Sequence, residues 1–318
     1  MGKTMVNEQV ILKKETTIKQ SKVAKKGLKK HKENILIHII IILACLACVI
    51  PFLLLISVSL SSEVDILEYG YRLIPKNIDF TAYNYILRDP GQVISAYQVT
   101  IFSSIVGTII SLTIMAMAAY ALSRTSFSYK KQVSFVIFFS MLFSGGLVPS
   151  YILITQYLNL KDNIWVYILP SLVNGFYVFM MRSFFSDLPE ALFESAKIDG
   201  ANELRIFFQI AIQLSKPVLA TVALFGVLQR WNDWFTALLY IEKQNLMSLQ
   251  YLLQRIMKDI ELVRQNQDLF PELSQMINLP NDSLRMAMAM VCAGPILIVF
   301  PFFQKYFVRG LTVGSVKG

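Results

Sequence analysis

The segment Asp187–Pro217, DLPEALFESAKIDGANELRIFFQIAIQLSKP, is a charged, helix-prone stretch that stands between two apolar spans. Asp187 or a neighbour can cap a helix that begins near Leu188–Pro189, because proline is tolerated in a first helical turn. Gly200 stands where a left-handed residue ends a helix, and glycine adopts that conformation without steric cost. A second helix is expected to restart near Asn202. The segment therefore predicts a helix, a glycine turn and a second helix.

The side chains of this segment suit contact with another protein. Ser195 and Ala196 are small enough to allow close packing, and Glu194, Lys197 and Asp199 offer charges to a polar partner. Taken alone, the segment could also be an ordinary amphipathic loop that lies on a membrane surface.

The composition indicates a membrane protein. Of the 318 residues, 55% are hydrophobic and 16% are charged, whereas soluble domains carry about a quarter charged residues. A helix needs roughly 20 mainly apolar residues to cross a bilayer, and its backbone polar groups must be paired within it. We therefore expect an all-α integral membrane protein with six transmembrane helices, near 34–60, 93–123, 132–156, 163–183, 217–241 and 286–306.

The distribution of basic residues predicts the orientation. Residues 1–33 carry ten Lys and three Glu ahead of the first span, so we expect this basic tail in the cytoplasm, where it could be held to anionic lipid. Alternation then places the segment 187–215 and both termini in the cytoplasm, and the loops 61–92 and 242–283 outside. The second outer loop contains an amphipathic stretch, Met247–Met257, which either contacts an external partner or lies against the membrane face.

The fifth span carries two charged residues, which are costly in lipid and usually face a cavity or each other. Arg230 and Asp233 are three residues apart, so they can pair on one face of a continuous helix. Trp231, Asn232 and Trp234 surround them and offer the aromatic faces and amide groups that a neutral sugar needs. The sequence leaves a structural ion pair and a solute site as equal alternatives. Weaker candidates for the solute path are Asn174 and Tyr177 in the fourth span.

The chain lacks the residues that several classes of function require. The chain contains no G-x-x-x-x-G-K-[ST] phosphate loop, so ATP hydrolysis on this chain is not expected. Cys45 and Cys48 have no His or acidic partner nearby, and with two His in the chain we expect no metal site. The net charge of +9 resides largely in the tail, so a nucleic-acid partner is not expected either.

Glu194–Ala201, ESAKIDGA, resembles the EAA–Gly motif of permease subunits in ATP-binding-cassette (ABC) importers. The family has Ala where Ser195 stands and usually Pro where Gln213 stands. The sequence therefore does not decide how the chain bends after the second helix. The stretch WNDW at 231–234 and the ending GLTVGSVKG at 310–318 are similar to those of MalG-like subunits of the carbohydrate-uptake group. The stretch FSGGLVP at 143–149 resembles the LplC/YtcP-like subgroup.

The resemblance implies a type I ABC importer permease fold with a cytoplasmic coupling helix, in the bacterial plasma membrane. It implies three partners: a second homologous permease subunit, an ATPase dimer that binds ATP and Mg, and an extracellular solute-binding protein. The chain itself would bind no cofactor, and the carbohydrate would be an oligosaccharide or polysaccharide fragment. Residues implied in contact with the ATPase are Glu194, Ser195, Ala196, Asp199, Gly200 and Ala201, together with Gly314, Lys317 and Gly318 of the C-terminal tail.

Three alternatives stay open at the level of sequence. The cargo could be a peptide or an anion, although few unpaired basic residues lie in the spans, which disfavours an anion. An intramembrane enzyme would need paired carboxylates, a Ser/His set or metal ligands within the spans, and only Arg230 and Asp233 are charged there. A membrane scaffold without transport would tolerate replacement of Gly200.

Overall fold

The computed structural model of the chain describes residues 35, 37–265 and 282–314. Within this part the fold is all-α, as predicted, and its extended structure amounts to a single isolated bridge between Ser61 and Ile78. The basic tail 1–33, residues 266–281 of the second outer loop and the final residues 315–318 lie outside the described residues.

The helices follow one another with short connections, several of which are single 3-10 or π turns. In chain order they are the helix Ile37–Ser59, α2 (Glu63–Tyr69), α3 (Thr81–Ile86), α4 (Pro90–Ser123), α5 (Lys130–Leu142), α6 (Leu147–Ile152), η1 (Leu153–Tyr157), η2 (Ile164–Tyr167), η3 (Leu169–Ser171), α7 (Gly175–Ser186), α8 (Glu190–Ile198), α9 (Glu203–Ile206), η4 (Phe207–Ala211), α10 (Ile212–Leu214), α11 (Lys216–Trp231), α12 (Phe235–Tyr240), η5 (Gln244–Leu246), α13 (Leu249–Gln265) and α15 (Asp282–Gly314).

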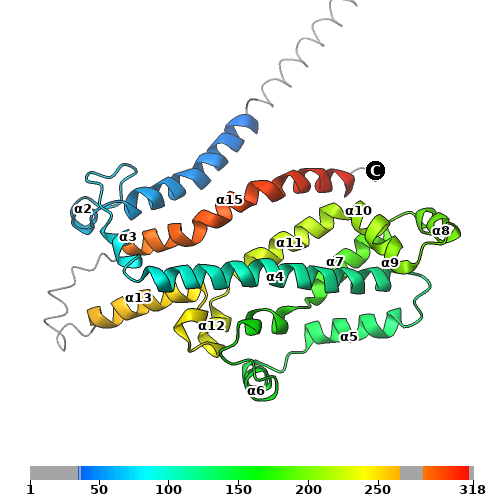
Figure 1. Ribbon diagram of the computed structural model, residues 1–318. Coiled ribbons are helices and arrows are strands. Elements are labelled where there is room, and N and C mark those ends of the chain that lie inside the picture. Colours follow the sequence, from blue (N-terminus) through cyan, green and yellow to red (C-terminus); the bar gives the residue numbers. More distant parts are fainter. Residues whose placement is uncertain (1–34, 36, 266–281, 315–318) are drawn as a thin grey trace, which may run out of the picture.

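Helix α4 is the element on which the others are assembled. Asp89 caps its first turn, because its Oδ1 accepts from the backbone N–H of Gln92 at 3.1 Å, and Pro90 suits the first helical position. The helix contacts α5, α7, α11 and α13, and it runs through the middle of the molecule in Figure 1. Ile101, Ile105 and Ile109 recur at four-residue spacing on its exposed side, which is the arrangement expected of a lipid-facing stripe.

The other apolar windows are interrupted helices. Two helices, Ile37–Ser59 and α4, are long and apolar enough to cross a membrane, and the number rises to five when each of three bent pairs counts as one span. The window 132–156 breaks at Phe143–Gly146, and its two parts meet at 113°, so it is not the continuous transmembrane helix that the sequence predicts. Gly146 at a φ of +87° and the Pro149 that follows it explain why the helix does not continue.

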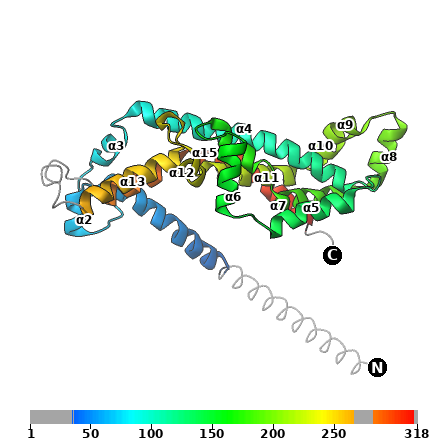
Figure 2. The ribbon, with the colours of Figure 1, turned by 90° about the horizontal axis from the view of Figure 1, so that it is seen from below.

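The predicted coupling segment, residues 187–215, and the small helices α2 and α3 lie at opposite ends of the molecule. Figures 1 and 2 both show α8 and α9 near the C-terminal end of α4, and α2 and α3 near its N-terminal end. At the α2 end, the carboxylate of Glu63 accepts hydrogen bonds from the backbone N–H groups of Asp282 and Ser283, so it caps α15. The predicted outer and cytoplasmic segments therefore gather at two separate ends.

The amphipathic stretch of the second outer loop forms α13. Its apolar side packs against α4 and α15, where Leu249, Leu252 and Leu253 are buried together with Leu284. Because this side is covered by the chain's own helices, α13 is part of the fold rather than a separate surface helix.

A short loop between η1 and η2 joins the start of the second outer loop. Asp162, at a φ of +54°, accepts from the backbone N–H groups of Glu242 at 2.7 Å and Lys243 at 2.9 Å. The N–H groups of Lys243 and Glu242 lower the pKa of Asp162. Lys161 and Glu242 form an ion pair at 2.6 Å beside this contact, so two connections that are far apart in sequence are joined here.

Candidate functional site

The segment after α7 folds into the helix, glycine turn and helix that its sequence predicts. Helix α8 is followed by Gly200 at a φ of +78°, and the side chain of Asn202 caps α9 by accepting from the backbone N–H of Arg205 at 2.8 Å. The sequence predicts Asp187 or a neighbour at the N-cap of α8, and the residue found there is the neighbour Pro189. Asp187 ends α7 instead, and Pro189 occupies the N-cap of α8 without a side-chain hydrogen bond.

Helix α8 is held to the end of α4 by an arginine that lies far from the predicted motif in sequence, at the C-cap of α4. Arg124 donates to Glu190 of α8 at 2.6 Å, and its guanidinium carbon lies 3.9 Å from the centre of the Phe193 ring. The Arg124 side chain is 8% exposed, so this ion pair and cation–π contact are largely shielded from water.

A second connection ties α9 to α4 and to α8. Glu203 accepts from the hydroxyl of Tyr120 at 2.9 Å and pairs with Lys197 at 2.7 Å. The hydrogen bond from Lys197 is the main cause that lowers the pKa of Glu203. The sequence predicts that Lys197 is available to a partner protein, but Lys197 forms an ion pair within the segment.

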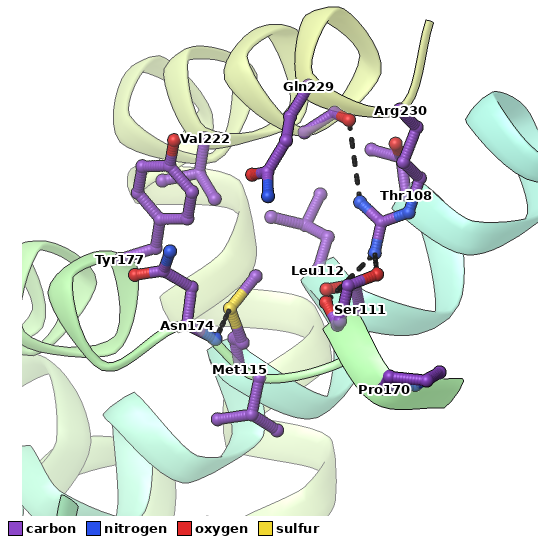
Figure 3. A pocket seen from close by; sticks show the side chains of 13 residues that line it. Thr108, Ser111, Leu112, Met115, Pro170, Asn174, Tyr177, Val222, Gln229 and Arg230 are labelled. Atoms are coloured by element: carbon purple, nitrogen blue, oxygen red, sulfur yellow. Dashed lines mark hydrogen bonds between the residues drawn. The ribbon is translucent and has the colours of Figure 1, made fainter. Parts of the chain in front are cut away.

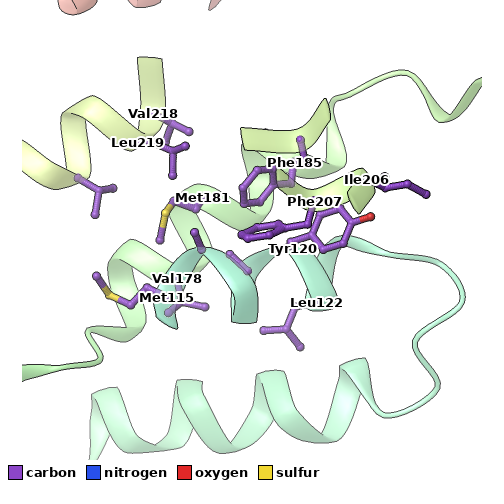
Figure 4. Close-up of a cluster of buried hydrophobic side chains, with 14 of the residues drawn as sticks. Met115, Tyr120, Leu122, Val178, Met181, Phe185, Ile206, Phe207, Val218 and Leu219 are labelled. Atoms are coloured by element: carbon purple, nitrogen blue, oxygen red, sulfur yellow. The ribbon is translucent and has the colours of Figure 1, made fainter. Parts of the chain in front are cut away.

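An apolar cluster beneath the segment supports both helices. Figure 4 shows side chains of α4, α7, η4 and α11 converging there, with Tyr120, Phe185 and Phe207 close together. The Tyr120 ring lies 5.3 Å from the Phe207 ring and 6.0 Å from the Phe185 ring, both between centroids. Burial of this cluster sets the positions of α8 and α9 relative to the rest of the fold.

The predicted coupling residues divide between a buried and an exposed side. Ala196 is buried and Ala201 is half-buried, and both belong to the apolar cluster or pack against it. Glu194, Ser195, Asp199 and Gly200 are exposed, and Ile198 beside them is 87% exposed, the largest fraction among the exposed large apolar side chains of the described residues. The outer side thus presents an apolar residue within a ring of polar ones.

A cavity of about 280 Å³ lies between α4, α7 and α11. Three of the predicted solute-path residues, Asn174, Tyr177 and Arg230, line it together. The remaining lining residues are Thr108, Ser111, Leu112, Met115, Pro170, Ser171, Val173, Val222, Gly226 and Gln229. Figure 3 shows Arg230 beside Thr108 and Ser111, with Asn174 and Tyr177 on the other side of the space.

Arg230 bonds only to neutral acceptors within the described part of the chain. Its Nη2 donates to the carbonyl of Ser171 at 3.1 Å, and its Nη1 lies 3.4 Å from the carbonyl of Gly226. Its Nε is buried and has no hydrogen-bond partner among the described residues. The side chain crosses α4 at Gly107, where a Cβ would lie 2.5 Å from Nε, so the glycine makes room for it.

The predicted pair of Arg230 with Asp233 is absent from the ion pairs of the described residues, within 4.0 Å. Helix α11 ends at Trp231, so the three-residue spacing does not place the two side chains on one helical face. Asp233 instead accepts from the backbone N–H of Thr236 at 3.0 Å, in the first turn of α12.

The other predicted solute-path residues lie away from this cavity. Trp231 is buried, and its Nε1 donates to the carbonyl of Cys292 in α15 at 3.0 Å. Asn232 accepts from the side chain of Gln250 in α13, and Trp234 stands in the turn before α12. Trp231 and Asn232 instead line a second cavity, of about 620 Å³, together with residues of α13 and α15. The WNDW stretch therefore connects α11 to α15, α12 and α13, and half of it lines a site other than the cavity beside Arg230.

Sequence reasoning missed the contribution of α4 to the cavity. Thr108 and Ser111 lie on one buried face of this helix. The signal was present as small and hydroxyl residues that recur every three or four positions through an otherwise apolar helix, at Thr100, Ser103, Ser104, Gly107, Thr108 and Ser111. Of the predicted C-terminal contacts, Gly314 ends α15, and Lys317 and Gly318 lie outside the described residues.

Fold and site together define a helical membrane protein with an exposed helix–glycine–helix segment at one end and a polar cavity in its interior. The chain belongs to the family of binding-protein-dependent transport system inner membrane components, which matches residues 127–313. It is 34% identical to the polygalacturonan/rhamnogalacturonan transport system permease protein YtcP of Bacillus subtilis, over 92% of this chain and 100% of YtcP. It is 37% identical to protein LplC of the same organism, over 85% of this chain and 90% of LplC.

A solved structure shares the fold. It is a bacterial ABC transporter involved in the import of the acidic polysaccharide alginate, and it matches with a TM-score of 0.74 at 29% identity, over 86% of this chain and 96% of that one. The predicted class of protein, an ABC importer permease of the plasma membrane, is confirmed by these similarities.

Proposed function

We propose that this chain forms half of the pore of an ATP-driven, binding-protein-dependent sugar importer, with an oligosaccharide or polysaccharide fragment as cargo. In this role it moves a solute and catalyses no reaction. A second permease subunit of the same family completes the pore, and an extracellular solute-binding protein delivers the sugar. ATP and Mg bind to a separate ATPase dimer.

The exposed side of the segment from α8 to α9 is the observation that carries this proposal. Its inner side is anchored by Arg124 and Phe193, whereas Ile198 and the charged Glu194 and Asp199 face outward. An apolar centre with a polar rim is typical of a protein interface. Anchoring on one side and exposure on the other suit a rigid segment that transmits force from the ATPase to α4.

The choice of cargo rests on the relatives and on the cavity. YtcP is named for polygalacturonan and rhamnogalacturonan, and the solved structure is of a transporter involved in the import of alginate. The cavity offers a hydroxyl, an amide and an aromatic ring, on Thr108, Asn174 and Tyr177. Sugar hydroxyls need such hydrogen-bond partners, and sugar rings stack on aromatic faces.

We place six spans in the membrane, with both termini in the cytoplasm. They are the helix Ile37–Ser59, α4, the bent pairs Lys130–Leu142 with Leu147–Tyr157 and Ile164–Ser171 with Gly175–Ser186, α11 with α12, and α15. Irregular backbone at membrane depth is tolerated where protein or water covers it, which fits the breaks within the bent pairs. The C-terminal end of α15 and the segment from α8 to α9 then face the ATPase on the same side.

Co-purification tests the coupling role. The chain is expressed with its transporter partners and solubilised, and retention of the ATPase subunit is compared between wild type, Gly200→Asp and Glu194→Lys. Gly70→Asp is the matched control, because Gly70 also has a positive φ, of +71°, and also has open space where a Cβ would lie, but stands near the opposite end of the molecule.

We expect the ATPase to be retained by wild type and by Gly70→Asp and lost in both coupling variants. Backbone strain alone would affect the two glycine variants alike. Equal retention by all four proteins would refute the coupling role and favour a membrane scaffold that does not transport.

A further inference from the structure

The cavity between α4, α7 and α11 holds a buried positive charge that forms no ion pair within 4.0 Å among the described residues, and Asp233 acts on it only from a greater distance. Arg230 is 7% exposed, and its acceptors within the described chain are the neutral oxygens of Ser171 and Gly226. The residues that line the cavity include no Asp or Glu. Asp233, the nearest acid in sequence, is used to start α12.

A charge in such a place is expensive unless it has a counter-ion. Moving an unpaired ion out of water costs several kcal/mol even after relaxation of the protein, and charged residues within membrane spans usually mark a solute or ion path. Gly107 leaves room for the side chain to lie across α4. The packing therefore keeps the cation at the cavity.

Two further polar atoms at this site lack partners. The Nε of Arg230 and the Oγ1 of Thr108, which is 6% exposed, are both buried without a hydrogen bond among the described residues. Buried polar groups are seldom left unpaired, so each of these two atoms calls for a partner outside the described residues. A planar guanidinium with a free N–H suits a carboxylate in particular.

We propose that the cavity binds the carboxylate of an acidic sugar residue, with Arg230 as the group that recognises its charge. This inference rests on the proposed function and names the chemical class of the sugar. Thr108, Asn174 and Tyr177 lie around the same space and serve the hydroxyl groups of the ring. Because Arg230 has no acidic partner among the described residues, the argument from sequence against an anionic cargo no longer applies.

The size of the cavity limits what is recognised here. Its volume of about 280 Å³ is close to the lower limit of roughly 300 Å³ for small-molecule pockets. One sugar unit at a time is therefore held against Arg230, and the rest of a longer chain lies in the half of the pore that the second permease subunit supplies.

The test uses the complete transporter with its binding protein, reconstituted in lipid. The probes are trigalacturonate and its fully methyl-esterified form, which differ in charge and a methyl group but share the sugar chain. ATP hydrolysis stimulated by each loaded probe is measured, and the ratio of acid to ester gives the charge selectivity. Variants are Arg230→Met, Arg230→Lys and Gly107→Ala, and the matched control is Arg182→Met, which removes an arginine of α7 that donates to Ser134 and does not line the cavity.

We expect Arg230→Met to lower the acid-to-ester ratio by about tenfold to a hundredfold, the usual loss for a hydrogen bond to a charged group. Arg230→Lys should keep most of the ratio, and Gly107→Ala should lower it by displacing the guanidinium while the charge stays in the chain. Arg182→Met should leave the ratio unchanged.

Two outcomes would overturn the proposal. A fall in hydrolysis that is equal for both probes would make Arg230 a structural residue, paired for example with the second permease subunit. Failure of trigalacturonate to stimulate the wild-type complex would make the ligand class wrong. Failure of the proposed function itself is distinct, because it appears as loss of the ATPase from the purified complex before any probe is added.

Discussion

Replacing Arg124 by Met should loosen α8 while the rest of the chain stays folded. Arg124 joins α4 to α8 through the ion pair with Glu190 and the contact with the Phe193 ring. Met retains an apolar chain that can still cover Phe193, so the change removes the charge and hydrogen bond rather than the packing. The effect should therefore be confined to the coupling segment.

The expected loss can be worked from these two contacts. The Glu190 side chain is 50% exposed, so solvent screening limits the ion pair to about 1 kcal/mol. A cation–π contact that is shielded from water contributes about 1 to 2 kcal/mol. The buried Nε of Arg124 has no partner among the described residues. Removing this unpaired group recovers part of the stability that loss of the two contacts costs. We therefore expect a local loss of about 2 kcal/mol, which corresponds to about a 30-fold change in an equilibrium constant.

Hydrogen exchange of the purified complex measures this loss directly. Amides of α8 should exchange about 30-fold faster in Arg124→Met, whereas those of α4 and α7 should not change. Arg205→Met is the matched control, since Arg205 is an exposed arginine of α9 that bonds to Gln209 in η4, the next helix along the chain. Unchanged exchange in α8, or equal acceleration by both variants, would show that Arg124 does not anchor the coupling helix.

Three further predictions concern other contacts. The pKa of Glu203 is lowered from its usual value, so its stabilisation of the coupling segment is complete at neutral pH and is lost as the pH falls through the lowered value; exchange of α9 amides should show this dependence, and Glu203→Gln should abolish it. Trp231→Phe removes the hydrogen bond to the carbonyl of Cys292 and should destabilise the packing of α11 on α15 by about 1 kcal/mol in denaturant unfolding; an unchanged midpoint would contradict this role. Asp162→Gly keeps the positive φ but removes the carboxylate, so the amides of residues 242 and 243 should exchange faster, and equal exchange would mean that the loop is held by other contacts.

The coupling segment could be predicted from sequence because its determinants are local. Gly200 ends one helix and Asn202 caps the next, and both act within one turn of the chain. The anchors of the segment could not be predicted in this way. Arg124 lies 66 residues before Glu190, and only the tertiary packing brings them together.

The contacts of the predicted solute-path residues could not be predicted from the sequence. The spacing of Arg230 and Asp233 predicts a pair only if the helix continues through both residues, and α11 ends between them. Two lone charges in one window therefore do not determine whether they pair. The bend of the third window could not be predicted for a similar reason, since a glycine pair marks a break but does not set its angle.

Helix α4 has 34 residues without a break, so it is a stiff rod about 51 Å long. Gly107, where Arg230 crosses, lies near its midpoint, and the Arg124 anchor lies just past one end. If α4 tilts as one unit about the point where Arg230 crosses it, a tilt of about 10° moves its two ends in opposite directions by about 4 Å each. A displacement of α8 would then move the end near α3 in the opposite direction, while Arg230 stays almost in place.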